Sequence, residues 1–326
     1  MTSRTAFITG IPGFAGSFLA EELLACGYRV VGTMREGEST HHLSAIEHRI
    51  TLFEADILDA EHNRKLVRKF KPDYIFHLAA MASVGRSFEM ERMTFLVNFE
   101  GTLNMLDAAR AHAGLRKFVF VSSADCYGVF APKNKTLRED QPLNPVSPYG
   151  IAKAAAEQAA RYYHRAYNLP VVVARSFNHS GPRQSDSFAI PSFAHQIAAI
   201  ESGLHKPELL VGDLSARRDI SDVRDIVRGY RLLAERGKPG NIYQLCSGRA
   251  VAMSRVLEML LKTSHRRIPV RVDKTRLRKA DIPILKGDNR KAVRELGYAP
   301  RHSLQSTVAD TLNYWRHELS GQSTRE

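Results

Sequence analysis

The sequence predicts an α/β fold built on a doubly wound parallel sheet, and two observations support this prediction. Short β-branched runs recur along the first half of the chain, and segments with helical apolar spacing separate them. The runs are apolar throughout rather than alternating, which indicates strands buried on both faces under helices. We expect strands at residues 6–9, 29–33, 51–54, 74–77, 117–122 and 171–176.

The segments between these strands carry apolar residues at positions i, i+4 and i+7, as amphipathic helices do. Such rows are formed by Leu19, Leu23 and Cys26, by Phe99, Leu103 and Leu106, and by Leu304, Val308, Leu312 and Trp315. Residues 178–187 are rich in Gly, Pro, Ser and Asn, which predicts a long loop. Helices are expected again near 188–201 and 222–236, with a strand near 242–245 and mixed structure over 268–300.

Composition indicates an ordinary globular protein, because 44% of the 326 residues are apolar and 25% are charged. Lys and Arg number 47 against 34 Asp and Glu, a formal net charge of +13. Such a charge would suit nucleic acid, but the basic residues are scattered, and apolar residues interrupt the densest stretch, 266–279, as in a strand. We therefore expect no nucleic-acid partner, and small anionic ligands fit the positive charge equally well.

The three cysteines, Cys26, Cys126 and Cys246, lie about a hundred residues apart. This spacing fits neither a disulfide framework nor a pair of metal-binding cysteines, so we expect no metal and a reducing compartment. No apolar run approaches the roughly 18 residues needed to cross a bilayer, and no signal peptide precedes the first strand. We expect a cytoplasmic protein without membrane contact.

The first strand is followed by Gly10, Gly13 and Gly16, which lie three residues apart where the first helix begins. Glycines at this spacing permit a sharp turn and close approach to a pyrophosphate, whose charge the helix N-terminus stabilises. Together with Pro12, Phe14 and Ala15, they predict the phosphate-binding turn of a Rossmann domain. We assign residues 1–177 and about 222–248 to this domain, and about 178–221 and 249–326 to a smaller substrate-binding lobe.

The residue after the second strand bears on which dinucleotide binds. An acidic residue there would hold the ribose hydroxyls of NAD, whereas Arg35 suits the 2′-phosphate of NADP(H). The alternative is that Arg35 is a solvated turn residue, and NAD(H) then remains the other cofactor. Weaker candidates for cofactor contact follow the third and fourth strands: Asp56 and Ile57, and Leu78, Ala79 and Ala80.

Tyr149 and Lys153 lie four residues apart, on one face of a helix that Pro148 would begin. A nearby ammonium favours a phenolate, so we expect Lys153 to lower the pKa of Tyr149 towards working pH. Ser123 ends the fifth strand at the carboxyl edge, where ligands of doubly wound folds bind. The three side chains predict proton transfer at a sugar or carbinol oxygen.

With these motifs in order, the chain resembles the extended short-chain dehydrogenase/reductase family, also called the NAD-dependent epimerase/dehydratase family. The resemblance covers nearly the whole chain through TGIPGFAG, LAA, SSADCYG, YGIAK and RSFNHSGP. Within the family, the segments FNHSGPRQ, SFAHQIAAIESG, VGDLSARRDISDVRDIVRGY and LRKADIP are similar to GDP-6-deoxy-4-keto-D-mannose reductases, which form GDP-D-rhamnose. The related GDP-mannose 4,6-dehydratases are the next most similar.

The resemblance implies contacts with a GDP-sugar at Ser83, Asn178, Arg183, Arg218, Arg278 and Asp281. Arg218 would meet the diphosphate, and Arg278 with Asp281 would bracket the ribose. Apart from this resemblance, the sequence leaves another interpretation open. Arg218 lies in an alternating charge run that could equally be a solvated helix start, and Arg278 lies in a basic stretch. The family also implies a homodimer through helices near 94–111 and 149–167.

Two features favour a reductase over a dehydratase. The dehydratase needs a carboxylate for acid/base work, and Asp125 is one methylene shorter than the Glu of that pattern, a displacement of about an ångström that could cost about a hundredfold in rate. Asp125 could also simply hydrogen-bond locally. The segment after Arg35 is short and partly acidic, where similar dehydratases carry a longer Arg- and Ser-rich insertion.

The sequence thus predicts an NADPH-dependent reductase of the 4-keto group of a GDP-linked 4-keto-6-deoxyhexose, with catalytic residues Ser123, Asp125, Tyr149 and Lys153. A GDP-mannose 4,6-dehydratase is the alternative, followed by a nucleotide-sugar 4-epimerase. A redox-sensing binding protein would have no need for Ser123, Tyr149 and Lys153 together.

Overall fold

The computed structural model of the protein describes residues 4–130, 136–277 and 282–323. Its centre is a seven-stranded sheet in which every neighbouring pair is parallel. In spatial order the strands are β10 (Ile242–Leu245), β6 (Val171–Ser176), β5 (Lys117–Ser123), β4 (Tyr74–His77), β1 (Thr5–Thr9), β2 (Arg29–Met34) and β3 (Ile50–Glu54). All predicted strands are confirmed, each within one residue at either end.

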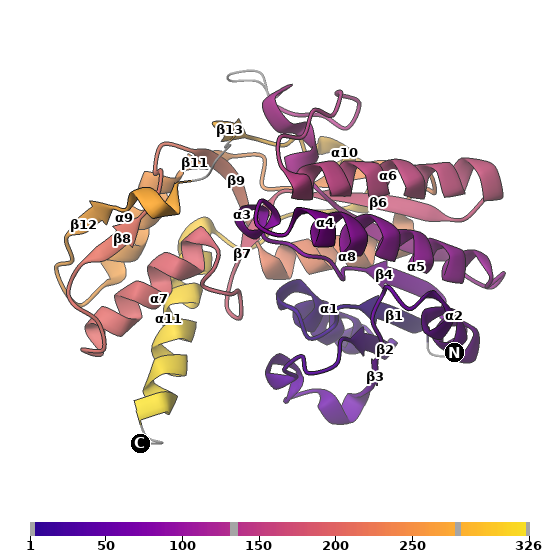
Figure 1. Ribbon diagram of the computed structural model, residues 1–326, viewed down its shortest axis with the longest axis horizontal. Helices are drawn as coiled ribbons and strands as arrows, with labels where there is room; N and C mark the ends of the chain where they lie inside the picture. Colours follow the sequence, from indigo (N-terminus) through magenta and orange to yellow (C-terminus); the bar gives the residue numbers. More distant parts are fainter. Residues whose placement is uncertain (1–3, 131–135, 278–281, 324–326) are drawn as a thin grey trace.

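Helices cover both faces of this sheet, which confirms the doubly wound architecture (Figure 1). One face packs against α1 (Phe14–Ala25), α8 (Val223–Arg236) and α10 (Arg290–Leu296), and the other against α2 (Ala60–Phe70), α5 (Gly101–Arg110) and α6 (Pro148–Tyr167). Two short helices, α3 (Val84–Ser87) and α4 (Glu91–Phe95), precede α5. The predicted inclusion of Cys26 in the apolar row was wrong, because α1 ends at Ala25 and Cys26 is exposed.

A second group of elements packs around its own apolar cluster beyond one end of the sheet, at the left of Figure 1. Its helices are α7 (Ala189–Glu201), α9 (Met253–Thr263) and α11 (Leu304–Ser323), and its two-stranded sheet joins β8 (Leu209–Val211) to β12 (Val270–Val272). The indole of Trp315 on α11 lies against the imidazole of His195 on α7, with ring centroids 4.5 Å apart. Among the helices of the described ranges, none has the length and apolarity that a membrane crossing requires.

A four-stranded arrangement joins the two groups of elements and corrects two expectations. The expected loop at 178–187 begins with strand β7 (Asn178–Ser180), which pairs in parallel with β9 (Arg217–Asp222). The alternative of a solvated helix start around Arg218 is also wrong, because β9 is buried between partners. Those partners are β7, β11 (Ala250–Ala252) and β13 (Ile284–Leu285). Both misreadings arise because the pairing partners lie far away in the sequence.

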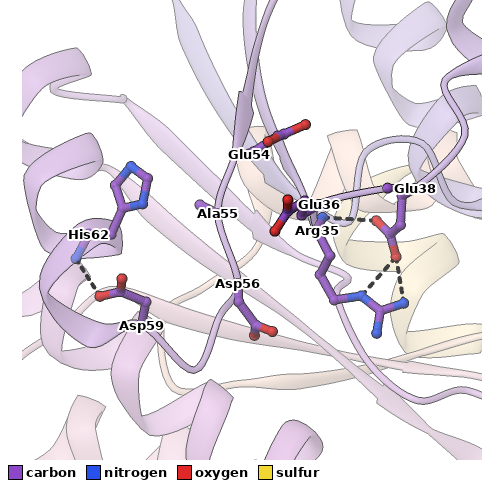
Figure 2. Close-up of a pocket in the computed structure, with 9 residues that line it drawn as sticks. Arg35, Glu36, Glu38, Glu54, Ala55, Asp56, Asp59 and His62 are labelled. Atoms are coloured by element: carbon purple, nitrogen blue, oxygen red, sulfur yellow. Dashed lines mark hydrogen bonds and ion pairs between the residues drawn. The ribbon is translucent and has the colours of Figure 1, made fainter.

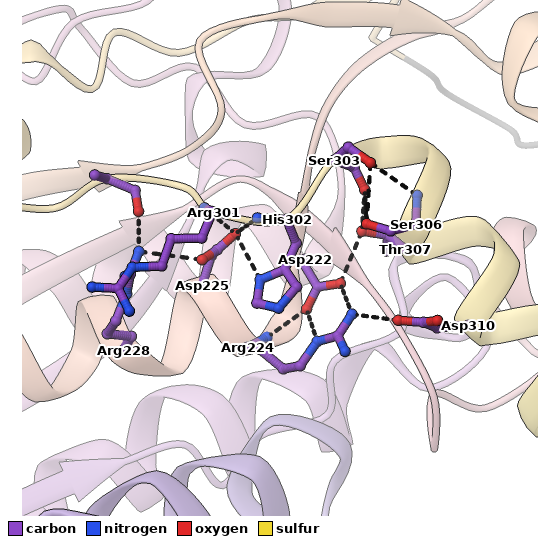
Figure 3. Close-up of polar contacts among 11 residues, drawn as sticks. Asp222, Arg224, Asp225, Arg228, Arg301, His302, Ser303, Ser306, Thr307 and Asp310 are labelled. Carbon is purple, nitrogen blue, oxygen red and sulfur yellow. Dashed lines mark hydrogen bonds and ion pairs between the residues drawn. The ribbon is translucent and has the colours of Figure 1, made fainter.

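An ion-pair network ties α8 to α11 across the junction (Figure 3). Asp222 caps the N-terminus of α8 by accepting from the Arg224 backbone at 2.8 Å. The Arg224 guanidinium then bridges Asp222 at 2.7 Å and Asp310 of α11 at 2.6 Å. The Thr307 hydroxyl donates to Asp222 at 2.8 Å. Charge-assisted bonds of this kind fix the start of α8 relative to the C-terminal helix.

Candidate functional site

The glycine turn lies between β1 and α1, where the strand order reverses, which is the usual ligand crevice of open α/β sheets. Gly10 has a φ of +70°, and a Cβ there would come within 3.0 Å of the Ala79 Cα. At Gly16 a Cβ would lie 2.3 Å from the Gly10 carbonyl oxygen, so only glycine lets the helix approach the turn. Gly13 is the N-cap of α1 and has no side chain to satisfy the first amides. Those amides suit a phosphate anion, so the turn fits a dinucleotide.

A buried hydrogen-bond chain fixes this turn to the end of β4. The Thr9 hydroxyl accepts from the backbone amides of Leu78 and Ala79, both at 3.1 Å, and therefore donates its own proton to Nδ1 of His77 at 2.8 Å. Nε2 of His77 then carries a proton and donates to the Thr102 hydroxyl at 3.1 Å. Only one neutral tautomer of His77 satisfies this chain.

These hydrogen bonds hold Leu78 and Ala79 beside the glycine turn, and a cofactor contact along Leu78, Ala79 and Ala80 stays a prediction. Burial, with a smaller effect from the nearby Lys153 charge, lowers the pKa of His77 to about 3. His77 therefore stays neutral and structural at ordinary pH. Neither His77 nor Thr9 was among the predicted site residues, although both directly precede motifs that were.

Ser123, Asp125 and Tyr149 come together at the carboxyl end of β5. The Ser123 hydroxyl donates to Asp125 at 3.0 Å and accepts from the Asp125 backbone amide at 3.2 Å. Tyr149, in the first turn of α6, lies close enough to Ser123 and Asp125 for both to influence the pKa of its phenol. The helix begins there because Ser147 caps it, accepting from the Gly150 amide at 3.1 Å, with Pro148 as the first helical residue.

The electrostatics of this cluster correct the prediction for Tyr149. Burial is the largest effect and raises the pKa of Tyr149 well above its usual range, and the Asp125 carboxylate raises it further. The interaction with Ser123 acts in the opposite direction and lowers the pKa, and Lys153 is not among the main causes. The expected lowering by Lys153 is therefore wrong for this structure, and the phenol is held protonated.

Lys153 lies one helical turn after Tyr149 on the same face of α6, and it is buried. Its ammonium donates to the Val121 carbonyl of β5 at 2.8 Å and lies 5.3 Å from the centre of the Phe120 ring. Burial lowers the pKa of Lys153 to about 8. The amine is thus anchored to the strand that carries Ser123, and its charge responds to mildly alkaline pH.

A buried ion pair stands behind the site, one further turn along α6. Glu157 is fully buried and pairs with Arg175 of β6 at 2.5 Å, while it accepts from the Ser122 hydroxyl at 2.7 Å. Arg175 also donates to the Tyr127 hydroxyl at 2.5 Å. Tyr149, Lys153 and Glu157 therefore form one row of α6 that faces the sheet, and the pair fixes the position of this row.

Arg35 lies at the mouth of an open pocket of about 640 Å³ beyond the ends of β2 and β3 (Figure 2). Asp56 also lines this pocket, so the structure brings together two of the predicted cofactor residues. Ile57 does not lie there: its side chain is buried against Gly101, and its carbonyl accepts from the Asn104 amide at 3.0 Å. Ile57 could contact a ligand only through its backbone.

The predicted substrate residues are less closely grouped. Asn178 starts β7 and is exposed, whereas Arg218 in β9 is buried and donates to the Arg217 carbonyl at 3.0 Å. Ser83 caps the short helix α3 by accepting from the Arg86 amide at 3.3 Å. Arg278 and Asp281 lie outside the described residues.

Arg183, in the segment after β7, contacts two side chains of α1. It pairs with Glu21 of α1 at 2.8 Å, and its guanidinium carbon lies 4.4 Å from the centre of the Phe18 ring. Its φ of +70° is unusual for a residue with a side chain. This arrangement ties the segment after β7 to α1, and a substrate contact at Arg183 stays a prediction.

The glycine turn at the reversal of strand order, with Ser123 and Tyr149 at the end of β5 on the other side of β4, defines an enzyme of the extended short-chain dehydrogenase/reductase class. A sequence profile of the GDP-mannose 4,6 dehydratase family matches residues 7–311. The chain belongs to this family.

Individual relatives agree with this assignment. The chain is 31% identical to the GDP-6-deoxy-D-mannose reductase of Pseudomonas aeruginosa, over 98% of this chain and 99% of the relative. It is 30% identical to the GDP-mannose 4,6 dehydratase of Drosophila melanogaster, over 95% of this chain and 85% of the relative. The structure of RMD from Pseudomonas aeruginosa complexed with NADPH has a TM-score of 0.83 at 29% identity and covers 97% of this chain and all of that one.

The neutral form of His77 makes stability depend on pH. Because the folded-state pKa is about 3 and the usual value is 6.5, the unfolded chain binds the extra proton first as pH falls. We expect this residue to remove stability between pH 6.5 and 3, by up to about 1.4 kcal/mol per pH unit. Urea unfolding at several pH values should show a shallower loss for His77→Asn. The exposed control His48→Asn should keep the wild-type slope, and equal slopes for both variants would contradict the assignment.

The Glu157–Arg175 pair predicts a large effect from a small change. Glu157→Gln keeps the shape but leaves the buried Arg175 charge without its carboxylate, which should lower the free energy of unfolding by about 3–5 kcal/mol. Urea unfolding of Glu61→Gln is the matched control, because the Glu61–Arg64 pair at 3.3 Å is largely exposed. A Glu157→Gln midpoint as high as that of the control would show that the pair does not hold α6.

Proposed function

We propose that the protein reduces the 4-keto group of a GDP-linked 4-keto-6-deoxyhexose with NADPH, converting GDP-6-deoxy-4-keto-D-mannose to GDP-D-rhamnose. The observation that carries the proposal is the grouping of Ser123, Asp125 and Tyr149 at the carboxyl end of β5, the edge of the sheet at which the glycine turn also lies. A reductase needs a proton donor for the carbonyl oxygen, and the Tyr149 hydroxyl is a group of that type at this strand end.

The chain supplies binding, orientation and a proton. Gly10, Gly13, Gly16 and the first turn of α1 would hold the cofactor diphosphate, and Arg35 would hold the adenosine side. Bound NADPH supplies the two electrons of the reduction as a hydride. NAD(H) is the alternative cofactor for the same turn.

Around the sugar, Ser123 would orient the carbonyl by hydrogen bonding and Tyr149 would give its proton to the oxygen. Lys153, anchored at the Val121 carbonyl, would hold the nicotinamide ribose. The exposed Asn178 and the buried Arg218 are the proposed contacts to the sugar and the diphosphate.

The comparison with a dehydratase turns on Asp125. In a dehydratase this carboxylate must work on the sugar, but here it accepts a hydrogen bond from the Ser123 hydroxyl, whose oxygen in turn accepts from the Asp125 amide. The short acidic segment after Arg35 and the end-to-end match with the reductase of Pseudomonas aeruginosa support the reductase as well. A GDP-mannose 4,6-dehydratase remains the second candidate because Asp125 does lie beside Ser123.

The test is NADPH absorbance over time with purified protein and GDP-6-deoxy-4-keto-D-mannose. We expect one NADPH to be consumed per sugar, and product analysis to give the rhamnose rather than its 4-epimer. A parallel incubation with GDP-mannose and NADP⁺ should give no keto sugar. Keto sugar formed there without net cofactor change would overturn the proposal in favour of the dehydratase.

The matched variant for this test is Tyr149→Phe. It should lower turnover by about 10²- to 10⁴-fold, as loss of a proton donor does, while the dissociation constant for NADPH stays within about twofold. Tyr162→Phe, on the exposed side of the same helix, controls for loss of a hydroxyl and should keep wild-type turnover. Full activity in Tyr149→Phe would remove this residue from the chemistry.

We also propose a homodimer through the outer surface of α4, the following π-helical turn and α6. Met93, Leu96 and Ile151 are large apolar residues there, each more than 40% exposed, on elements that pack together. A cluster of exposed apolar side chains on neighbouring helices is typical of a protein–protein contact.

The dimer is tested by sedimentation. Leu96→Glu places a charge in the proposed contact and should convert a dimer to a monomer, because an unpaired charge there would have to be buried. Leu204→Glu is the control, since Leu204 is 56% exposed but lies at the far end of α7. A wild-type protein that sediments as a monomer, or a Leu96→Glu dimer, would contradict this surface.

A further inference from the structure

Arg35 has an intramolecular partner in the pocket proposed for the cofactor's adenosine side. The Glu38 carboxylate accepts from Arg35 Nε at 2.9 Å and from Nη2 at 2.7 Å, so one oxygen takes one whole edge of the guanidinium. Its other oxygen accepts from the Arg35 backbone amide at 3.1 Å. Figure 2 shows the two side chains turned towards each other.

The backbone holds Glu38 in this position. The Glu38 amide donates to the Arg35 carbonyl at 3.2 Å, which closes a tight turn directly after β2. Gly37 occupies the turn with a φ of +74°, a conformation that glycine adopts without strain. The carboxylate is therefore returned to the guanidinium by a short, closed loop, and little chain entropy opposes the pair.

The surrounding pocket is acidic. Apart from Arg35, none of the residues that line the pocket is a lysine or arginine. Five of them carry carboxylates: Glu36, Glu38, Glu54, Asp56 and Asp59. A phosphate dianion placed beside Arg35 would meet this negative field as well as the single cation. A ribose with free hydroxyls would instead meet acceptors of the type that bind ribose hydroxyls.

We propose that Glu38 is a specificity-determining residue whose carboxylate competes with the 2′-phosphate of NADP(H) for the guanidinium of Arg35. This inference rests on the proposed function, since it concerns the cofactor of the same site. A 2′-phosphate must either displace Glu38 from its edge of Arg35 or share the guanidinium with it, and in both cases two like charges come close together. Binding of NAD(H) requires neither step. Glu38 therefore reduces the ratio of NADP(H) affinity to NAD(H) affinity that Arg35 would otherwise give.

The size of the effect follows from exposure. The side chain of Arg35 is 63% exposed and that of Glu38 is 31% exposed, so solvent screens the pair. Exposed ion pairs of this kind correspond to affinity changes of up to about fivefold. The expected change is therefore a shift in cofactor preference, not a complete reversal.

The experiment uses the whole protein and two probes without a nicotinamide, ADP-ribose and 2′-phospho-ADP-ribose, with binding measured by calorimetry. Glu38→Gln should tighten 2′-phospho-ADP-ribose about threefold to fivefold and leave ADP-ribose within about 1.5-fold. Glu36→Gln is the matched control, because it removes the same charge from the same turn and keeps the Arg35–Glu38 pair. It should tighten 2′-phospho-ADP-ribose less than twofold.

A double variant distinguishes competition for the Arg35 guanidinium from the general electrostatic effect of removing a carboxylate. In an Arg35→Gln background, Glu38→Gln should help 2′-phospho-ADP-ribose no more than Glu36→Gln does, because no guanidinium remains to compete for. High salt should reduce the difference between the single variants.

The outcomes separate this inference from the proposed function. Equal effects of Glu38→Gln and Glu36→Gln, with good binding of either probe by the wild type, would overturn the role of Glu38 and leave the reductase proposal standing. Binding of neither probe by the wild type would instead remove the dinucleotide from the proposed function, and this inference with it.

Discussion

Parallel pairing of β1, β4 and β5 is the constraint on which the candidate site depends. Because the three strands run in one direction and in register, their carboxyl ends reach one edge of the sheet. The glycine turn, the 78–80 segment and Ser123 thereby reach the same edge, although the turn and Ser123 are more than a hundred residues apart in the sequence. The buried chain through Thr9 and His77 locks two of these ends to each other, so the crevice is shaped before any ligand arrives.

The site is supported by polar groups that are buried from solvent. Glu157 and Arg175 join α6 to β6, and Lys153 joins the same helix to β5. Such groups are costly to bury, but once paired they permit few alternative arrangements. Helix α6 therefore cannot slide or rotate without breaking several of these bonds at once. The position of Tyr149, in the first turn of the same helix, is fixed by the same bonds.

The sequence was sufficient to predict the sheet and the members of the candidate site. Local signals indicate them: β-branched runs, glycine spacing, and Tyr149 with Lys153 four residues apart. It was insufficient where distant partners decide the outcome. The strand at Asn178 exists because β9 pairs with it, and the raised pKa of Tyr149 comes from burial and from Asp125. The Arg35–Glu38 pair was within reach, since the two residues lie three apart, but only the turn at Gly37 shows that they meet.

The contact between Trp315 and His195 has a spectroscopic consequence. The chain contains a single tryptophan, and that indole lies in the packing between α7 and α11, away from the seven-stranded sheet. Intrinsic tryptophan emission therefore reports on the C-terminal group of helices alone, whereas far-ultraviolet circular dichroism reports on the whole chain. Coincident melting by the two signals would mean that both parts unfold as one cooperative unit, and separate transitions would give each part its own stability.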